Sequence, residues 1–369
     1  MAPSKVNNAE VCSIKKIDPF EVPPEEKVSL ALDANKAALI NDKIKNTSTR
    51  LGMTKDHRWF QSSDGAKVDV ETTMTGLMHM SVAQANGNME IVPDSESMCA
   101  GYEYIKSTDW NDFTSDISKL AIEAVNSITP PPGTYPVVVD PDIVGVLFHE
   151  AFGHASEGDL VTSGESVLNN RIGTRLATES VTITDEGTVE GGFYYPYDDE
   201  GVKKDKTTIV DRGVLKGFIL DRDSASRLDS PPTGNGRAQD FENLPIVRQT
   251  NYMLKPGKHE FSELVEDIKS GLYIRGKGST GGEVEVGMGA FTFNVGPSKI
   301  IKKGELAETV RGVVISGSIL DTLKTVDAVG KDFTVKTSVF GGCGKSAQRA
   351  TVGFGGPHIR VQKMTVGGR

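Results

Sequence analysis

The sequence predicts an α+β protein of two domains, and its length and the order of its patterns support this class. The chain has 369 residues, which corresponds to about two domains that each bury a core. Strand patterns follow one another with few helices between them, which favours antiparallel sheets. The stretch TPPPG at 129–133 is typical of a linker. We therefore expect a small amino-terminal domain of helices and an antiparallel sheet at residues 1–132, and a strand-rich domain of antiparallel sheets at residues 133–369.

The amino-terminal domain is predicted to contain two helices and a β-hairpin. Apolar residues recur with a helical period from residue 25 to about residue 46, which predicts the first helix. Residues 59–87 contain a short strand, a turn at Asp64–Gly65 and a long alternating run, a pattern that predicts the hairpin. A second amphipathic helix is predicted at 112–128.

The second domain is predicted to begin with a buried strand at 134–142 and a helix directly after it. Asp142 is a suitable N-cap for this helix, because its short carboxylate side chain accepts from the first turn. The rest of the domain consists almost entirely of strand patterns. Two further helices are expected among them, at 260–270 with Gly271 as its C-cap, and at 317–327.

The composition excludes several classes of protein. The formal net charge is -9 and the pI is about 5.3, which argues against a basic surface for nucleic acid. The three cysteines, Cys12, Cys99 and Cys343, are odd in number and widely spaced, which favours a reducing compartment over a disulfide framework. The amino terminus shows no apolar signal segment, and no window is long enough to span a bilayer. We expect a cytoplasmic protein without a nucleic-acid or membrane partner.

The stretch HEAFGHASEGD at 149–159 contains a candidate metal site. The usual zinc-protease signature places its two histidines four residues apart on one helix face, whereas His149 and His154 are five apart. Residues five apart on an α-helix are separated by about 140° around its axis, so both histidines cannot reach one ion from a regular helix. Either a π-type bulge or a break before His154 would bring them together, and Gly153 tolerates both.

Zinc catalysis requires imidazole or thiolate ligands, an open coordination position and a carboxylate near the bound water. The two histidines supply two ligands, and Glu150 is placed to act on the water. A third protein ligand is needed. The candidates are Glu157 and Asp159 nearby, and the distant Cys343 in GGCGKSAQ.

Five stretches of the chain resemble the TldD/PmbA (TldD/TldE) family of zinc-dependent proteases. They are HEAFGHASEGDL at 149–160, TITDEGTVEGGFYYPYDDEG at 182–201, TIVDRGVLKGFILDRDSASRL at 208–228, PTGNGRAQDFENLPIVRQTNYML at 232–254 and GGCGKSAQ at 341–348. They occur in the family's order, and the resemblance extends over residues 20 to 369. Family members usually have a longer region before residue 25, so we expect a shortened amino terminus.

The resemblance implies specific roles by position. His149, His154 and Cys343 would be the ligands of Zn²⁺ and Glu150 the general base, as in the catalytic TldD-type subunit. The family assembles as homodimers or as heterodimers with a TldE/PmbA-type paralogue. It trims small or unfolded peptides, including peptide precursors and antitoxins, which lie along a β-strand in an enclosed cavity.

The stretch GNGR at 234–237 has two interpretations. It is either a turn or a loop that contacts substrate through Asn235 and Arg237. In the second interpretation Arg237 binds a substrate carboxylate.

Three alternatives compete with a metalloprotease. GGCGKS is not a phosphate loop, because the Walker pattern requires glycine where this chain has Val339. A cysteine protease with Cys343 as nucleophile leaves Glu150 and the second histidine without a role. The third alternative is a non-catalytic peptide-binding subunit of a paralogue complex.

Overall fold

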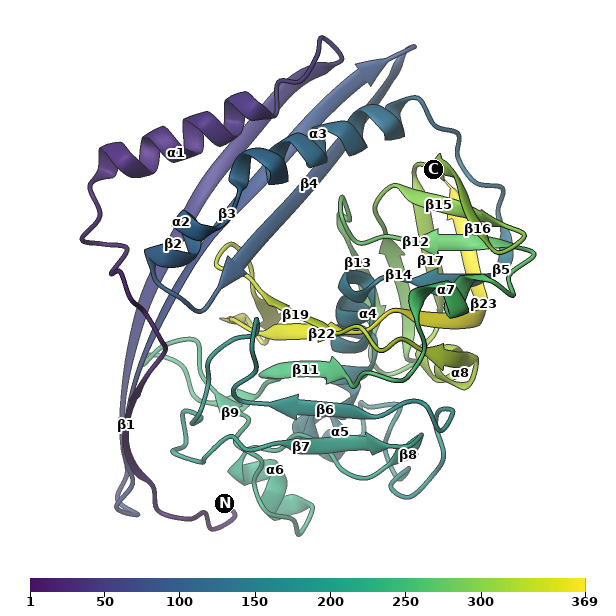
Figure 1. The fold of residues 1–369 in the computed structure, drawn as a ribbon. Coiled ribbons are helices and arrows are strands. Elements are labelled where there is room, and N and C mark those ends of the chain that lie inside the picture. Colours follow the sequence, from purple (N-terminus) through teal and green to yellow (C-terminus); the bar gives the residue numbers. More distant parts are fainter. Residues whose placement is uncertain (369) are drawn as a thin grey trace.

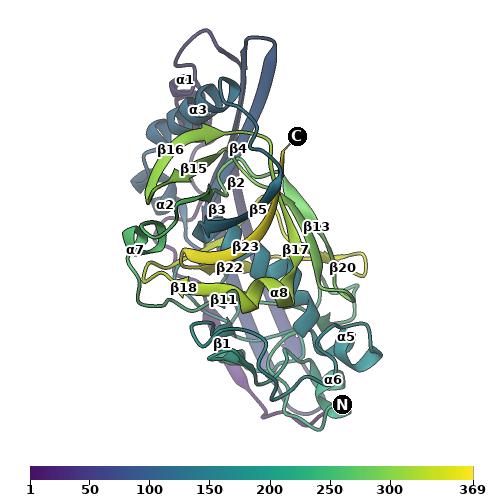
Figure 2. The same cartoon turned by 90° about the vertical axis from the view of Figure 1, so that its right-hand side faces the viewer.

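The computed structural model describes residues 1–368 and confirms the α+β class. A long, thin amino-terminal sheet runs beside a strand-rich carboxy-terminal region (Figure 1). The view turned by 90° shows the long strands passing behind the carboxy-terminal sheets (Figure 2). Among the helices of the described residues, none is both long and apolar enough to cross a membrane.

The amino-terminal sheet is built around one long central strand. Its strands are β1 (Asn8–Cys12), β2 (Ile44–Gln61), β3 (Lys67–Ala85) and β4 (Asn88–Met98). β3 pairs antiparallel with β2 and β4, and its first residues pair in parallel with β1. The hairpin at Asp64–Gly65 is confirmed, but its first strand has 18 residues instead of being short. β2 is an edge strand whose side chains are mostly half-buried or exposed, so its apolar alternation is weak.

Three helices accompany this sheet: α1 (Pro24–Ala37), α2 (Tyr102–Ser107) and α3 (Trp110–Val125). The predicted first helix was too long, because it ends at Ala37 and Ile44 begins β2. Ile44 is apolar for a different reason, since it is buried in the core between the sheet and α3. Periodicity alone does not separate an apolar residue of the helix from an apolar residue of the strand that follows it.

The largest carboxy-terminal sheet has nine strands. In spatial order they are β13 (Gly281–Glu285), β14 (Ala290–Asn294), β17 (Val313–Ser318), β23 (Ile359–Gly368), β5 (Gly133–Val139), β12 (Ser270–Ile274), β15 (Ser298–Lys302) and β16 (Glu305–Val310), with β18 (Val326–Val329) paired to β23. All pairs are antiparallel except β5 with β12.

A second, six-stranded sheet supports the candidate site. Its order is β19 (Thr334–Thr337), β22 (Gly353–Gly356), β11 (Asn251–Leu254), β6 (Ile183–Glu186), β7 (Thr207–Asp211) and β8 (Val214–Leu215). Only β11 with β22 is parallel. Two small ribbons, β9 (Gly236–Arg237) with β10 (Ile246–Val247) and β20 (Cys343–Lys345) with β21 (Gln348–Ala350), complete the strands.

The helices of this region are short. They are α4 (Pro141–Leu147), α5 (Gly158–Ser163), α6 (Arg222–Arg227), α7 (Phe261–Val265) and α8 (Ile319–Lys324). α4 lies directly on β22, because Gly145 has no side chain. A Cβ there would lie 2.7 Å from the Phe354 ring and 2.9 Å from the Gly355 nitrogen. This close packing on β22 sets the position of the carboxyl end of α4, from which the chain continues to the candidate site.

Two predicted helix ends in this region were wrong. Asp140, not Asp142, caps α4, because the Asp140 side chain accepts from the Ile143 N–H at 3.0 Å. Gly271 is not a C-cap, since α7 ends at Val265 and Gly271 lies in β12. A Cβ at Gly271 would lie 2.3 Å from a carbonyl oxygen of the neighbouring strand, so the glycine serves strand packing.

Candidate active site

The two histidines of the motif lie on a π-helical turn. After α4 the chain continues as a π-helix at Phe148–Gly153 and then as a 3₁₀ turn at His154–Ser156. The π-helix is the first of the two distortions expected from the five-residue spacing. The ring centroids of His149 and His154 are consequently 5.2 Å apart, and both side chains are buried.

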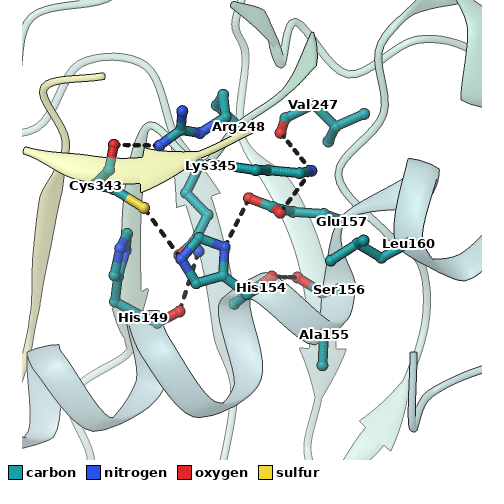
Figure 3. A network of polar contacts seen from close by, with 12 residues as sticks. His149, His154, Ala155, Ser156, Glu157, Leu160, Val247, Arg248, Cys343 and Lys345 are labelled. Carbon is teal, nitrogen blue, oxygen red and sulfur yellow. Dashed lines mark hydrogen bonds and ion pairs between the residues drawn. The ribbon is translucent and has the colours of Figure 1, made fainter. Parts of the chain in front are cut away.

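Cys343 reaches these histidines from the ribbon of β20 and β21. Its Sγ lies 3.1 Å from Nε2 of His154, although the two residues are 189 positions apart in the sequence. One ligand atom from each of His149, His154 and Cys343 lies within 4.8 Å of the other two. In residues 1–368, this is the one group of three or more potential ligands at such distances. Figure 3 shows the three side chains pointing toward one another.

A buried carboxylate and a lysine surround the second histidine. Glu157 Oε1 lies 3.2 Å from Nδ1 of His154, and the Glu157 side chain has no exposed surface. Lys345, two residues after Cys343, places its Nζ 2.8 Å from Glu157 Oε2 and 2.6 Å from an Asp159 oxygen. Glu157 and Asp159 therefore neutralise Lys345, and the ribbon is joined to the motif by two sets of contacts (Figure 3).

The charges of these groups are strongly coupled. Burial raises the pKa of the Cys343 thiol, but hydrogen bonds to and positive charge on His149 and His154 outweigh it and lower the pKa to about 5. Burial lowers the pKa of His154, yet the Glu157 carboxylate and Cys343 hold it well above its usual value. For Glu157 burial raises the pKa, while His154 and Lys345 lower it to about 2. At neutral pH these shifts favour a thiolate at Cys343 and an imidazolium at His154 in the metal-free site.

Glu150 is the most accessible of the charged side chains at this turn. Its carboxylate lies 3.6 Å from Nε2 of His154, and its side chain is 37% exposed. Glu150 thus lies beside the buried cluster with its own side chain partly open to solvent. A carboxylate beside the ligand nitrogens but open to solvent is suited to proton transfer.

Residues 247–249 form hydrogen bonds to the two segments that make up the cluster, the π-helix with His149 and the ribbon with Cys343 and Lys345. The sequence did not point to these residues. Arg248, fully buried, donates to the Cys343 carbonyl oxygen. Gln249 Nε2 donates to the His149 carbonyl oxygen at 3.0 Å. The Val247 carbonyl accepts from Lys345 at 3.0 Å. The one available signal was their place in the family-like stretch 232–254, which no local pattern connects to the histidines.

Asn235 and Arg237 are buried side chains with protein partners. Asn235 donates to an Asp185 carboxylate oxygen at 2.7 Å and accepts from Lys204 at 2.9 Å. Arg237 donates to the backbone carbonyls of Gln249 and Thr351. Their contact with substrate stays a prediction.

Two family models match the chain and together span nearly all of it. The PmbA/TldA metallopeptidase C-terminal domain matches residues 132–368, and the PmbA/TldA metallopeptidase central domain matches residues 17–128. Both models describe domains of the metallopeptidase class. The chain belongs to the TldD/PmbA family, as the five sequence stretches indicated.

Curated relatives agree with this membership. The chain is 39% identical over 350 residues to a metalloprotease of Methanothermobacter thermautotrophicus, an alignment that covers 95% of this chain and 76% of the relative. It is 33% identical over 350 residues to a zinc metalloprotease TldD homologue of Saccharolobus solfataricus, covering 93% and 76% of the two chains.

Solved structures share the fold. TldE from Thermococcus kodakarensis superimposes with a TM-score of 0.78 at 20% identity, covering all of this chain and 79% of that one. A crystal structure of a Thermotoga maritima protein gives a TM-score of 0.80 at 22% identity, covering 99% and 79%. At these identities the likeness concerns the fold.

Proposed function

We propose that this chain is a zinc-dependent peptidase that hydrolyses small or unfolded peptides. His149, His154 and Cys343 hold the zinc, and Glu150 is the general base. The observation that carries the proposal is the meeting of three buried ligand atoms within 4.8 Å from segments far apart in sequence. Two imidazoles and a thiolate leave one coordination position of a tetrahedral zinc for water or substrate, as catalytic sites require.

The residues present fit a zinc ion. Zinc binds sulfur at about 2.3 Å and imidazole nitrogen at about 2.0 Å, so tetrahedral ligand atoms lie roughly 3.3 to 3.7 Å apart. The shortest contact of the cluster joins Cys343 Sγ and His154 Nε2 at 3.1 Å, which is a few tenths of an ångström below this range. Nδ1 of His149 is buried without a hydrogen-bond partner in the described chain, which leaves this nitrogen available as a ligand. The Glu157 carboxylate on the other nitrogen of His154 orients that ring.

The chain's own residues supply the proton transfers. Zinc, when bound, polarises the scissile carbonyl and acidifies the attacking water. Glu150 takes the proton as the water oxygen bonds to the carbonyl carbon. It then delivers this proton to the amine as the carbon–nitrogen bond breaks. A thiolate ligand donates more charge than imidazole, so we expect slower turnover than in enzymes with three histidine ligands.

The substrate and the assembly follow from the family's properties. We propose that an extended peptide lies along a strand inside an enclosed cavity. Pairing with a strand edge uses hydrogen bonds to the peptide backbone, so it tolerates many side-chain sequences. Peptide precursors and antitoxins are the candidate substrates, and the cytoplasm is the proposed compartment. The proposed assembly is a homodimer or a heterodimer with a TldE/PmbA-type paralogue, as the family resemblance implies.

A cysteine protease is a second candidate, and one observation favours it. Cys343, His154 and Glu157 form a thiol, imidazole and carboxylate chain with contacts of 3.1 and 3.2 Å, and the Cys343 pKa is lowered to about 5. This is the arrangement of an activated cysteine nucleophile. It gives no role to His149, whose ring lies beside that of His154, or to Glu150. A non-catalytic binding subunit, the third possibility, would need none of these groups.

Metal analysis and turnover assays on two variants separate the three possibilities. We expect about one zinc per chain in the wild type, much less in His149→Ala, and loss of peptide turnover on chelation that zinc restores. Glu150→Gln should retain zinc and lose at least about 100-fold in turnover. Turnover that survives both chelation and Glu150→Gln would identify the cysteine mechanism. Absence of both zinc and turnover in the wild type would leave the non-catalytic binding subunit as the remaining possibility.

A further inference from the structure

We propose that Gln249 is the positioning residue that keeps His154 in register with His149 and Cys343. The inference rests on the proposed metal site for its consequence, but its structural basis is independent of any metal. A π-turn is rare inside a helix and has an identifiable cause, such as a side chain inserted into the hydrogen-bond ladder. Gln249 is the side chain inserted here.

The hydrogen bonds of the His149 carbonyl define the π-turn. This oxygen accepts the N–H of His154, five residues later, where an α-helix would offer the N–H of Gly153. The same oxygen also accepts Nε2 of Gln249 at 3.0 Å. A carbonyl oxygen has two lone pairs, so it can accept both bonds. The Gln249 amide thus binds the helix at the point where the ladder shifts by one residue.

Gly153 makes room for this amide. A Cβ on Gly153 would lie 2.1 Å from Oε1 and 2.5 Å from Cδ of Gln249. The backbone of Gly153 is ordinary right-handed helix, with φ -61° and ψ -50°, which any residue adopts. The glycine is therefore needed for space beside Gln249, and the expected conformational freedom is not used.

Gln249 is itself held rigidly. It is 1% exposed, and its backbone carbonyl accepts from the buried guanidinium of Arg237. The next residue, Thr250, donates its N–H to Asp185 at 2.9 Å. The preceding residue, Arg248, holds the Cys343 carbonyl. One short segment therefore sets the π-turn and the position of the sulfur relative to it.

The consequence for the metal ligands is geometric. If the turn relaxed to an α-helix, His154 would rotate away from His149 to about 140° around the axis. The three ligand atoms could then no longer share one ion. A positioning residue of this kind typically changes metal affinity by about 10- to 100-fold.

The test uses Co²⁺ titrated into the metal-free protein, with thiolate-to-metal absorbance as the readout. Gln249→Met keeps the volume and removes the donor, and we expect at least about tenfold weaker Co²⁺ binding and a weaker absorbance band. Gln61→Met, the same change at an exposed position, is the matched control and should leave both unchanged. Equal Co²⁺ affinity in Gln249→Met and the wild type would overturn the proposal.

Two further measurements keep the test decisive. Gly153→Ala should also weaken Co²⁺ binding, and the double variant Gly153→Ala with Gln249→Ala should stay weak, because the donor to His149 is still missing. Full recovery in the double variant would show that Gln249 is only a steric neighbour. A crystal structure of metal-free Gln249→Met should show the His149 carbonyl accepting from Gly153, and a persistent π-turn would contradict the proposal. A wild type that binds no metal would refute the proposed function while leaving this backbone test valid.

Discussion

At the scale of single residues, the charge of Glu157 is the most consequential feature around the proposed ligands. Its carboxylate is completely buried and lies between His154 at 3.2 Å and Lys345 at 2.8 Å. A buried charge without partners is very costly, so these two cations account for its presence. The same contacts select which nitrogen of His154 faces Cys343.

Replacing Glu157 should therefore weaken metal binding without removing a ligand. We expect Glu157→Gln to lower zinc affinity by about 10- to 100-fold, because the amide cannot orient the His154 ring as a carboxylate does. Competition with a chromophoric chelator measures this affinity. Glu179→Gln, at a carboxylate that is 67% exposed, is the control and should have no effect. Unchanged affinity in Glu157→Gln would show that the ring is held by packing alone.

The ionisation of Cys343 provides a second prediction at this scale. With the pKa lowered to about 5, the metal-free protein should carry a thiolate above that pH and lose it as the pH falls through about 5. The difference in ultraviolet thiolate absorbance between the wild type and Cys343→Ser measures it. Cys99 is the internal contrast, since burial raises its pKa to about 12. A midpoint near the usual thiol value would contradict the coupling to the histidines.

At the scale of secondary-structure elements, β3 contains a buried histidine at the core of the amino-terminal sheet. His79 is fully buried and hydrogen-bonded to Thr49 at 2.8 Å and to Ser81 at 2.9 Å. Burial lowers its pKa from 6.5 to about 4. The strand is thus built around a neutral imidazole that joins β2 and β3 and, through Ser81, contacts α3 at Ser118.

This histidine should make the protein less stable in acid. Between about pH 6.5 and pH 4 the unfolded chain binds a proton at His79 that the folded chain does not, so the free energy of unfolding falls as pH falls. We expect a loss of about 1–3 kcal/mol from this group. Urea unfolding of the wild type and His79→Gln at both ends of the range isolates it. If both proteins lose stability equally, His79 is not the source.

At the scale of the whole molecule, ion pairs connect the amino-terminal sheet to the helix that precedes the site. Lys336 on β19 lies 2.8 Å from Glu96 on β4 and 3.1 Å from Asp142 on α4. All three side chains are about one-quarter to one-third exposed. The lysine separates carboxylates from two distant parts of the chain, so it contributes to holding α4 beside the long strands.

Removing this lysine should destabilise the protein. Lys336→Met leaves Glu96 and Asp142 close together without a cation, and we expect a loss of about 1–2 kcal/mol in the free energy of unfolding. Lys324→Met removes an exposed pair with Asp321 and should cost less than about 0.5 kcal/mol. Thermal and urea unfolding of both variants provide the comparison. Equal losses of stability in the two variants would show that the ion pairs of Lys336 contribute no more than an exposed surface ion pair.

The sequence by itself determined the α+β class, the family and the candidate ligands. These follow from local patterns and from the order of five motifs, which do not depend on distant contacts. Element boundaries were less well predicted: Ile44 and Val28 are both apolar, but one lies in a strand and the other in a helix. Ile44 is buried against α3, whereas Val28 is exposed, and periodicity contains no information on this difference.

Only the tertiary structure decided how the motif is arranged. The sequence left open a π-bulge or a helix break, and it left Glu157, Asp159 and Cys343 as candidates for the third ligand until the family resemblance was considered. The structure brings Cys343 to the histidines, while Glu157 binds the far nitrogen of His154. The π-turn depends on Gln249, 100 residues from His149, so no local pattern could reveal it. Helix geometry is local, but the contact that shifts the hydrogen bonds by one residue comes from the segment between β10 and β11.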